Sequence, residues 1–194
     1  WFEVEPGTNP GFLYQQNTMR DALVAGINLN IFNKHCDRVK MANIAQMVNV
    51  LQSVILTDGE RMIKTPTWFV FYLYQAHQDA ELLDSTLETA MVGPEGHQAP
   101  NMTESVSMGK DGKMHITLTN ESVTEDYPID VILDSGKAVD VSGMILTGEM
   151  HEHNTFDNPD QVKCTSFDDV KLTDDGLKLT LPKCSVLHLT VTVE

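Results

Sequence analysis

Two carboxamide side chains stand at the end of an apolar run in the first half of the chain. Residues 39–46 are mostly apolar, and Asn43 and Gln46 occupy the last part of this run. The run predicts a buried strand, because strands of a parallel sheet are covered by helices on both faces. A carboxamide at the carboxyl end of such a strand can bind a ligand, since α/β barrels build their sites from strand ends and loops. The alternative is that both side chains only hydrogen-bond neighbouring backbone.

Other residues that could do chemistry are sparse. Trp1 precedes a stretch rich in Pro and Gly, and an aromatic ring in a loop can stack on a sugar, although a single Trp is also a common packing residue. His151 and His153 resemble a metal pair, but their surroundings are typical of a surface loop and offer no third ligand. The three cysteines lack Cys-x-x-Cys spacing, which argues against a disulfide framework and a zinc site. We therefore expect no metal and no cofactor.

The negative charge of the chain is concentrated in its second half. The formal net charge is −15 over 194 residues. Residues 1–79 hold six Lys/Arg against seven Asp/Glu, a net −1, whereas residues 80–194 hold seven against twenty-one, a net −14. An acidic surface repels phosphate backbones, so we expect no nucleic-acid partner. The change in charge also predicts a domain boundary between residues 79 and 80.

Length and composition allow one large domain or two small ones. An apolar content of 41% is enough for a substantial core. The sequence has neither a run of 18 apolar residues nor a charged-then-apolar leader, so we expect no membrane span. The chain opens at Trp1 rather than Met, and we do not expect this residue to be the natural start of a gene product.

Helical spacing marks two segments that flank the 39–46 run. Between residues 12 and 33 an apolar residue recurs every four positions, which predicts a long helix with Asp21 on its polar side and the apolar positions Met19, Leu23, Ile27 and Ile31 on the other. Thr65 as a cap and Pro66 as a first residue predict a second helix that runs to about residue 78. Helix, strand and helix resemble one end of an α/β barrel, although a full eightfold barrel needs roughly 250 residues.

Beyond residue 79 the apolar period changes to two. Alternating apolar and polar residues occupy residues 114–119, 129–133, 177–181 and 186–193, with turn signals between them. Short alternating strands of this kind predict an all-β sandwich over residues 80–194. We expect the alternate polar positions to form a solvated face that carries the acidic charge.

Several long motifs resemble the retaining α-L-arabinofuranosidases of glycoside hydrolase family 51. They span almost the whole chain and occupy residues 4–17, 20–26, 41–46, 48–52, 55–59 and 153–159. The resemblance implies a (β/α)8 barrel followed by a β-sandwich of jelly-roll type. Residues 1–79 would then be the carboxyl-terminal segments of the barrel, and residues 80–194 would be the sandwich.

The same resemblance assigns roles to single residues. Gln46 matches a glutamine that hydrogen-bonds bound arabinose, Trp1 matches a tryptophan that lines the sugar pocket, and Asn43 is a supporting candidate. Both catalytic glutamates of the family fall before the position that matches Trp1, and neither Glu3 nor Glu5 matches a catalytic position. The resemblance therefore implies that this chain alone is inactive.

The implied partners are an arabinofuranosyl oligosaccharide or polysaccharide, the remainder of the barrel, and further copies of the protein in a homo-oligomer. The resemblance implies an exo-acting hydrolase that removes terminal arabinofuranose from arabinoxylan, arabinan or their oligosaccharides. The alternative is that residues 80–194 form an independent carbohydrate-binding or structural module. Only Tyr127, Phe156 and Phe167 are aromatic after residue 79, which favours a structural role over sugar binding.

Overall fold

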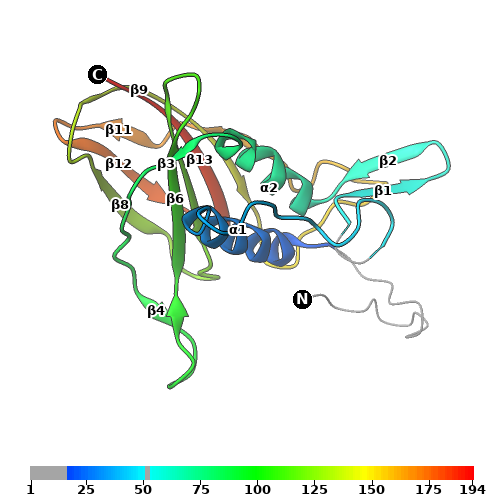
Figure 1. Cartoon of the computed structure of the whole chain (residues 1–194). Coiled ribbons are helices and arrows are strands. Elements are labelled where there is room, and N and C mark those ends of the chain that lie inside the picture. The colour runs from blue at the N-terminus through cyan, green and yellow to red at the C-terminus, as the bar shows by residue number, and fades with distance from the viewer. Residues whose placement is uncertain (1–16, 51–52) are drawn as a thin grey trace.

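Two helices lie against an antiparallel β-structure in the computed structural model, which describes residues 17–50 and 53–194 (Figure 1). The helices are α1 (Met19–Lys34) and α2 (Pro66–Tyr74), and α2 continues into the short 3-10 helix η2 (Gln75–His77). Neither helix in this part of the chain has the length and apolar content needed to cross a membrane.

Two antiparallel sheets make up most of the structure. The larger sheet has the strand order β10-β9-β13-β7-β6-β3, and the smaller has the order β11-β12-β8. The larger sheet contains β3 (Glu81–Leu82), β6 (Met102–Met108), β7 (Met114–Asn120), β9 (Ala138–Thr147), β10 (Thr165–Phe167) and β13 (Ser185–Val193). The smaller sheet contains β8 (Tyr127–Ile132), β11 (Val170–Leu172) and β12 (Gly176–Leu181). Two hairpins stand apart from them, β1 (Ile55–Asp58) with β2 (Arg61–Lys64) and β4 (Met91–Val92) with β5 (Ala99–Pro100).

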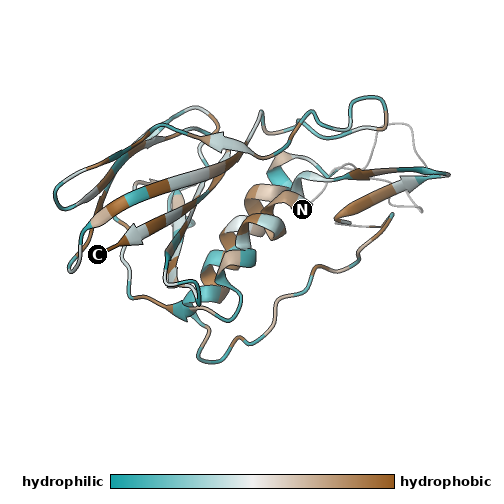
Figure 2. Ribbon diagram, turned by 90° about the horizontal axis from the view of Figure 1, so that it is seen from above, coloured by the Kyte–Doolittle hydropathy of each residue, from teal (hydrophilic) through white to brown (hydrophobic). Residues whose placement is uncertain are grey.

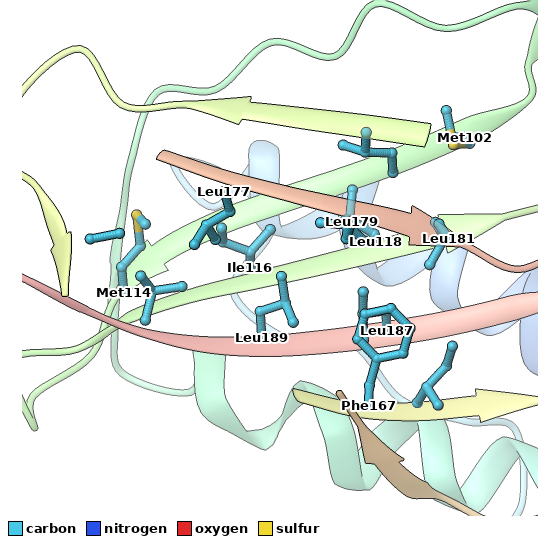
Figure 3. Packing of buried hydrophobic residues seen from close by; sticks show 14 residues of the cluster. Met102, Met114, Ile116, Leu118, Phe167, Leu177, Leu179, Leu181, Leu187 and Leu189 are labelled. Atoms are coloured by element: carbon cyan, nitrogen blue, oxygen red, sulfur yellow. The ribbon is translucent and has the colours of Figure 1, made fainter. Parts of the chain in front are cut away.

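The two sheets pack face to face over an apolar core (Figure 3). The six-stranded sheet contributes Ile116 and Leu118 from β7 and Leu187 and Leu189 from β13, all at most 3% exposed. The three-stranded sheet contributes further leucines, and Leu181 is fully buried. Alternation along each strand directs these residues to one face, as the period of two requires.

The helices cover the opposite face of the six-stranded sheet. A second core joins Met19 and Leu23 of α1 and Val70 and Leu73 of α2 to buried residues of the sheet and its loops, among them Leu146, Val162, Cys184 and Val186. The six-stranded sheet is therefore the middle layer between the three-stranded sheet and the helices. Figure 2 shows the hydrophobic and hydrophilic residues alternating along the strands.

A polar cluster lies inside this helix-facing layer. The Asn30 side chain of α1 is fully buried, and its Oδ1 accepts hydrogen bonds from Tyr74 Oη at 2.8 Å, Thr117 Oγ1 at 2.8 Å and Ser105 Oγ at 3.1 Å. Its Nδ2 donates to Thr103 Oγ1 at 3.0 Å. Burial raises the pKa of the Tyr74 phenol well above its usual range, which keeps the hydroxyl protonated as a donor.

The strand predictions for residues 80–194 are confirmed, but the prediction of a solvated polar face is wrong for the central strands. All seven residues of β7 are buried, and the polar residues Thr117 and Thr119 are fully covered. The helices cover this face, and a local alternation cannot reveal what lies above it. In β12 the alternate positions Lys178 and Thr180 are exposed as expected.

The helix predictions need smaller corrections. The second helix, its proline at the first position and Thr65 as its N-cap residue are confirmed, but Thr65 Oγ1 donates to Ser53 O and makes no capping hydrogen bond to α2. The described part of the first helix begins at Met19 rather than at residue 12, and residues 12–16 lie outside the described residues. Asp21 is buried rather than solvated, because its carboxylate accepts hydrogen bonds from the N-cap Thr18. Ile31, expected on the buried face, is 44% exposed.

The predicted strand over residues 39–46 is absent from the described structure. This stretch has no regular secondary structure. A strand needs a neighbour to satisfy its amide and carbonyl groups, and the described residues place no strand beside it. An apolar run alone therefore predicted the wrong local structure here.

Candidate functional site

The structure places Asn43 and Gln46 in the irregular segment between α1 and β1. Both side chains are exposed, and within the described part of the chain neither carboxamide makes a side-chain hydrogen bond. Trp1 lies outside the described residues. The two described carboxamides are therefore open to solvent on one segment, with their donors and acceptors free for a ligand.

The chain that follows Gln46 is tied to strand β1. Met47 O accepts hydrogen bonds from Val54 N at 3.2 Å and Ile55 N at 3.0 Å. Asn49 binds Thr57 through both ends of its carboxamide, since Asn49 Nδ2 donates to Thr57 Oγ1 and Thr57 N donates to Asn49 Oδ1, each at 2.7 Å. The segment after Gln46 is therefore held beside the β1–β2 hairpin.

The carbonyl of Ser53 joins the amino-terminal ends of both helices. Asn17, which precedes the N-cap of α1, donates from Nδ2 to Ser53 O at 3.2 Å, and Thr65, the N-cap of α2, donates from Oγ1 to the same oxygen at 2.9 Å. Ser53 is fully buried. One backbone oxygen thus fixes the two helix starts relative to each other. Ser53, which carries this oxygen, follows the candidate residue Gln46 closely in the sequence.

The loop of residues 148–162 closes the same end of the molecule. Met19 N donates to Glu152 O at 2.8 Å, which attaches the loop to the start of α1. Asn154 Nδ2 donates to Lys64 O at 2.9 Å, which attaches the loop to β2. Asn154 is 5% exposed, so this link is shielded from solvent.

Cations and aromatic rings anchor the hairpin. The Arg61 guanidinium lies 4.8 Å from the centre of the Phe156 ring, and the Lys64 ammonium lies 3.8 Å from that of Trp68. Trp68 also stacks on Tyr72 with ring centres 5.4 Å apart. Each cation over a ring contributes about 0.5–1 kcal/mol at an exposed site. The hairpin extends away from the body of the molecule (Figure 1), and these contacts attach it through β2.

Two carboxylates at this end, Asp58 and Glu152, have structural partners. Asp58 forms an ion pair with Arg61, and Glu152 accepts hydrogen bonds from Glu149 N at 2.9 Å and Gln161 Nε2 at 3.1 Å. Across residues 17–50 and 53–194, no group of three or more His, Cys, Asp or Glu residues could hold a metal ion. The exposed carboxamides of Asn43 and Gln46 can donate and accept hydrogen bonds at this end.

Sequence reasoning missed the residues that position this segment. Neither Asn49, which lies within a mostly apolar run, nor Ser53 was predicted from the sequence to have a structural role. A polar residue inside an apolar run was the available signal at Asn49. Its role depends on Thr57, whose position beside it follows only from the fold.

The described architecture is a pair of antiparallel sheets with two helices attached to one face, and the exposed carboxamides of Asn43 and Gln46 lie in the irregular segment between α1 and β1. A family model described as "Alpha-L-arabinofuranosidase C-terminal domain" matches residues 1–185. The chain belongs to this family.

Two relatives of high identity support the assignment. An intracellular exo-alpha-L-arabinofuranosidase of Bacteroides ovatus is 44% identical over 192 residues, which cover 97% of this chain and 37% of that protein. The crystal structure of the GH51 arabinofuranosidase from Xanthomonas axonopodis pv. citri is 41% identical and superposes with a TM-score of 0.92, covering 99% of this chain and 39% of that one. The chain thus spans less than half the length of these relatives. The predicted membership of glycoside hydrolase family 51 is confirmed.

A more distant structure shares the fold. The GH51 alpha-L-arabinofuranosidase from Thermotoga petrophila is 23% identical, with a TM-score of 0.82 over 98% of this chain and 41% of that one. The predominance of sheet with few helices therefore persists at low sequence identity.

Proposed function

We propose that this chain is the carboxyl-terminal part of a retaining, exo-acting α-L-arabinofuranosidase that releases terminal arabinofuranose from arabinoxylan, arabinan or their oligosaccharides. The observation that carries the proposal is the 44% identity with a protein named as an intracellular exo-alpha-L-arabinofuranosidase, over 97% of this chain. Both catalytic glutamates of such an enzyme would come from the preceding barrel, so the isolated chain would bind sugar weakly and would not hydrolyse it.

In this proposal residues 1–79 complete a (β/α)8 barrel and residues 80–194 form the jelly-roll sandwich. Exposed apolar side chains support this assignment: of the fifteen large ones among the described residues, nine lie between residues 24 and 72. Such side chains mark a surface that another part of a protein covers.

The β-structure supports the helices in this proposal and does not bind sugar itself. Sugar-binding modules need exposed planar rings, whereas Phe167 is 7% exposed and Phe156 lies beneath Arg61. The Tyr127 hydroxyl is engaged with Asn101 and Glu125. By contrast, the six-stranded sheet contributes both apolar and polar partners to α1 and α2. This arrangement favours a structural role.

Gln46 would hydrogen-bond a hydroxyl of the arabinose ring, with Trp1 lining the pocket and Asn43 assisting. In the full-length enzyme, Gln46→Ala removes a bond whose loss strands a buried partner, at a cost of about 1–3 kcal/mol. This corresponds to a decrease of roughly 5- to 150-fold in kcat/KM on an aryl arabinofuranoside. If the bond strengthens as the ring approaches its oxocarbenium-like transition state, the decrease falls mainly on kcat.

A matched control is Gln75→Ala, which removes the same exposed side chain type at the start of η2. We expect it to retain wild-type kinetics. The isolated chain, assayed in parallel, should show no turnover. A Gln46→Ala enzyme with unchanged kcat/KM and a lowered Tm would assign Gln46 to structure, and turnover by the isolated chain would refute the placement of the catalytic groups outside it.

A further inference from the structure

The backbone turns sharply three residues after Gln46. Asn49 has φ of +58°, in the left-handed region that most residues avoid and that Asn tolerates better than other non-glycine residues. In the described part of the chain only Asp79 and Cys184 share this feature among non-glycine residues. A turn of this kind persists when its surroundings hold it, and it decides the direction in which the preceding residues run.

Asn49 is held by three hydrogen bonds to one strand. Its backbone N donates to Ile55 O at 3.1 Å, and its carboxamide both donates to and accepts from Thr57 at 2.7 Å. Residues 48 and 55 also form an isolated parallel bridge. The side chain thus imitates a neighbouring strand and satisfies polar groups on the exposed edge of β1.

Strand β1, to which Asn49 is bonded, is itself held in place by β2. The hydrogen bonds between Asn49 and Thr57 can therefore fix the position of Asn49. Thr57 pairs with Met62 in β2. At the end of that strand Ile63 is 5% exposed. The Lys64 ammonium lies over the Trp68 ring, and the Lys64 carbonyl accepts a hydrogen bond from Asn154 Nδ2. The connection therefore runs from Asn49 through the hairpin to α2 and to the 148–162 loop.

We infer that Asn49 is a positioning residue that sets Gln46 in place for the sugar by clamping the turn after it to Thr57. The inference rests on the proposed function of Gln46. Asn49 contacts no substrate in this role. It restricts the segment so that the Gln46 carboxamide is preorganised, and affinity for a ligand increases when its partner does not have to be ordered on binding.

Variants of the full-length enzyme separate the turn from the clamp. Asn49→Gly keeps a backbone that adopts positive φ and removes both side-chain bonds. Asn49→Asp keeps a residue tolerated at positive φ and can accept from both Thr57 N and the Thr57 hydroxyl. We expect Asn49→Gly to lower kcat/KM on an aryl arabinofuranoside by roughly 3- to 30-fold, in the range found for coupled neighbours, and Asn49→Asp to restore most of the loss. Asp79→Gly is the control, because it frees a positive-φ residue of another segment and should leave kinetics unchanged.

A double-mutant cycle with Gln46→Ala tests the role directly. If Asn49 acts through Gln46, Asn49→Gly has less than about a twofold effect on kcat/KM in the Gln46→Ala background. Equal losses in both backgrounds, with the same decrease in Tm, would overturn the inference and leave Asn49 as a stabilising turn residue. If Gln46→Ala alone leaves kcat/KM unchanged, both the assigned role of Gln46 and the inference about Asn49 are refuted. If Gln46→Ala lowers kcat/KM but Asn49→Gly does not, only the positioning role of Asn49 is refuted.

Discussion

The two faces of the six-stranded sheet solve the same packing problem in different ways. The face toward the three-stranded sheet is covered by aliphatic side chains such as Leu187 and Leu189. The face toward the helices mixes an apolar cluster with a buried polar centre at Asn30, Ser105 and Thr117. Apolar contacts tolerate repacking if volume is kept, whereas buried hydrogen bonds need particular partners at particular positions. The helix-facing layer therefore specifies where α1 sits, and the sheet-to-sheet layer supplies most of the apolar burial.

This difference matters because the candidate site is attached to the helices. The start of α1 is bound to the 148–162 loop, and the starts of both helices share the carbonyl of Ser53. A helix that slid along the sheet would move these attachments. A polar layer that resists sliding thus maintains the geometry of the end that carries Gln46.

The largest effect is expected from a cavity between the sheets. Leu189→Ala removes a fully buried side chain of the central strand β13 and should lower the free energy of unfolding by about 2–5 kcal/mol. Urea unfolding of the chain measures the change. Leu172→Ala, at a position that is 45% exposed, is the control and should cost much less. A similar loss for both variants would contradict the assignment of this layer as the main apolar core.

Acid should weaken the helix-facing layer selectively. His77 Nδ1 lies 2.7 Å from Ser107 Oγ and Nε2 lies 2.9 Å from Thr117 Oγ1, between η2 and the sheet. Burial, reinforced by the charges of His188 and His115, lowers the pKa of His77 to about 4 from an ordinary 6.5. The unfolded chain therefore binds this proton at a higher pH than the folded chain, and stability present above pH 6.5 is lost as the pH falls toward 4.

A depression from 6.5 to about 4 corresponds to roughly 3 kcal/mol at about 1.4 kcal/mol per pKa unit. His188 shifts in the same direction, chiefly through burial, and His115 lies 3.1 Å from it with Asp111 on its other side. Unfolding free energies of wild type and His77→Gln between pH 7.5 and 4.5 measure the contribution of His77. We expect the unfolding free energy of His77→Gln to decline less steeply as the pH falls. The contributions of carboxylates are common to both proteins and cancel in the comparison. Parallel pH profiles would show that His77 is not proton-linked to folding.

Sequence patterns predicted each layer to a different extent. The strands of residues 177–181 and 186–193 follow from their own alternation, which is a local property. The covering of Thr117 and Thr119 does not, because the helices that bury them come from a distant part of the chain. Asn30 lies 75 residues from Ser105 and 87 from Thr117, so no local signal distinguished this helix asparagine from a solvated one.

The roles of the candidate site residues rest on resemblance more than on local pattern, and they stay predictions. Gln46 and Asn43 were singled out as the polar end of a strand, yet the described segment is irregular and Trp1 lies outside the described residues. A strand of a parallel sheet depends on neighbours that its own sequence does not contain. The contact of Asn49 was missed for the same reason, because it depends on Thr57, which is eight residues away and not adjacent in the sequence.

The smallest of these effects is expected from the polar centre, and it separates specificity from stability. Asn30→Leu preserves approximate volume but removes the acceptor shared by Tyr74, Thr117 and Ser105. Alternative partners limit the loss, since Tyr74 Oη also lies 3.0 Å from Gly26 O and Ser105 Oγ lies 3.0 Å from Thr117 Oγ1. We therefore expect a decrease of about 2 kcal/mol in the free energy of unfolding, within the range for stranding buried polar groups.

Adding Tyr74→Phe and Ser105→Ala to Asn30→Leu removes two of the stranded donors, while Thr117 Oγ1 keeps Ser105 O and His77 Nε2 as partners. This triple variant should recover much of that decrease, because replacing both sides of a buried polar contact by apolar groups can be nearly neutral. Asn28→Leu is the control on the same helix, at an exposed position whose Nδ2 donates only to Val24 O among its side-chain bonds in the described structure. If the polar centre specifies the position of α1, the triple variant regains stability yet shows faster amide hydrogen exchange in α1 than wild type, since apolar contacts leave the helix free to shift. Wild-type exchange in the triple variant would mean that shape alone holds the helix on the sheet.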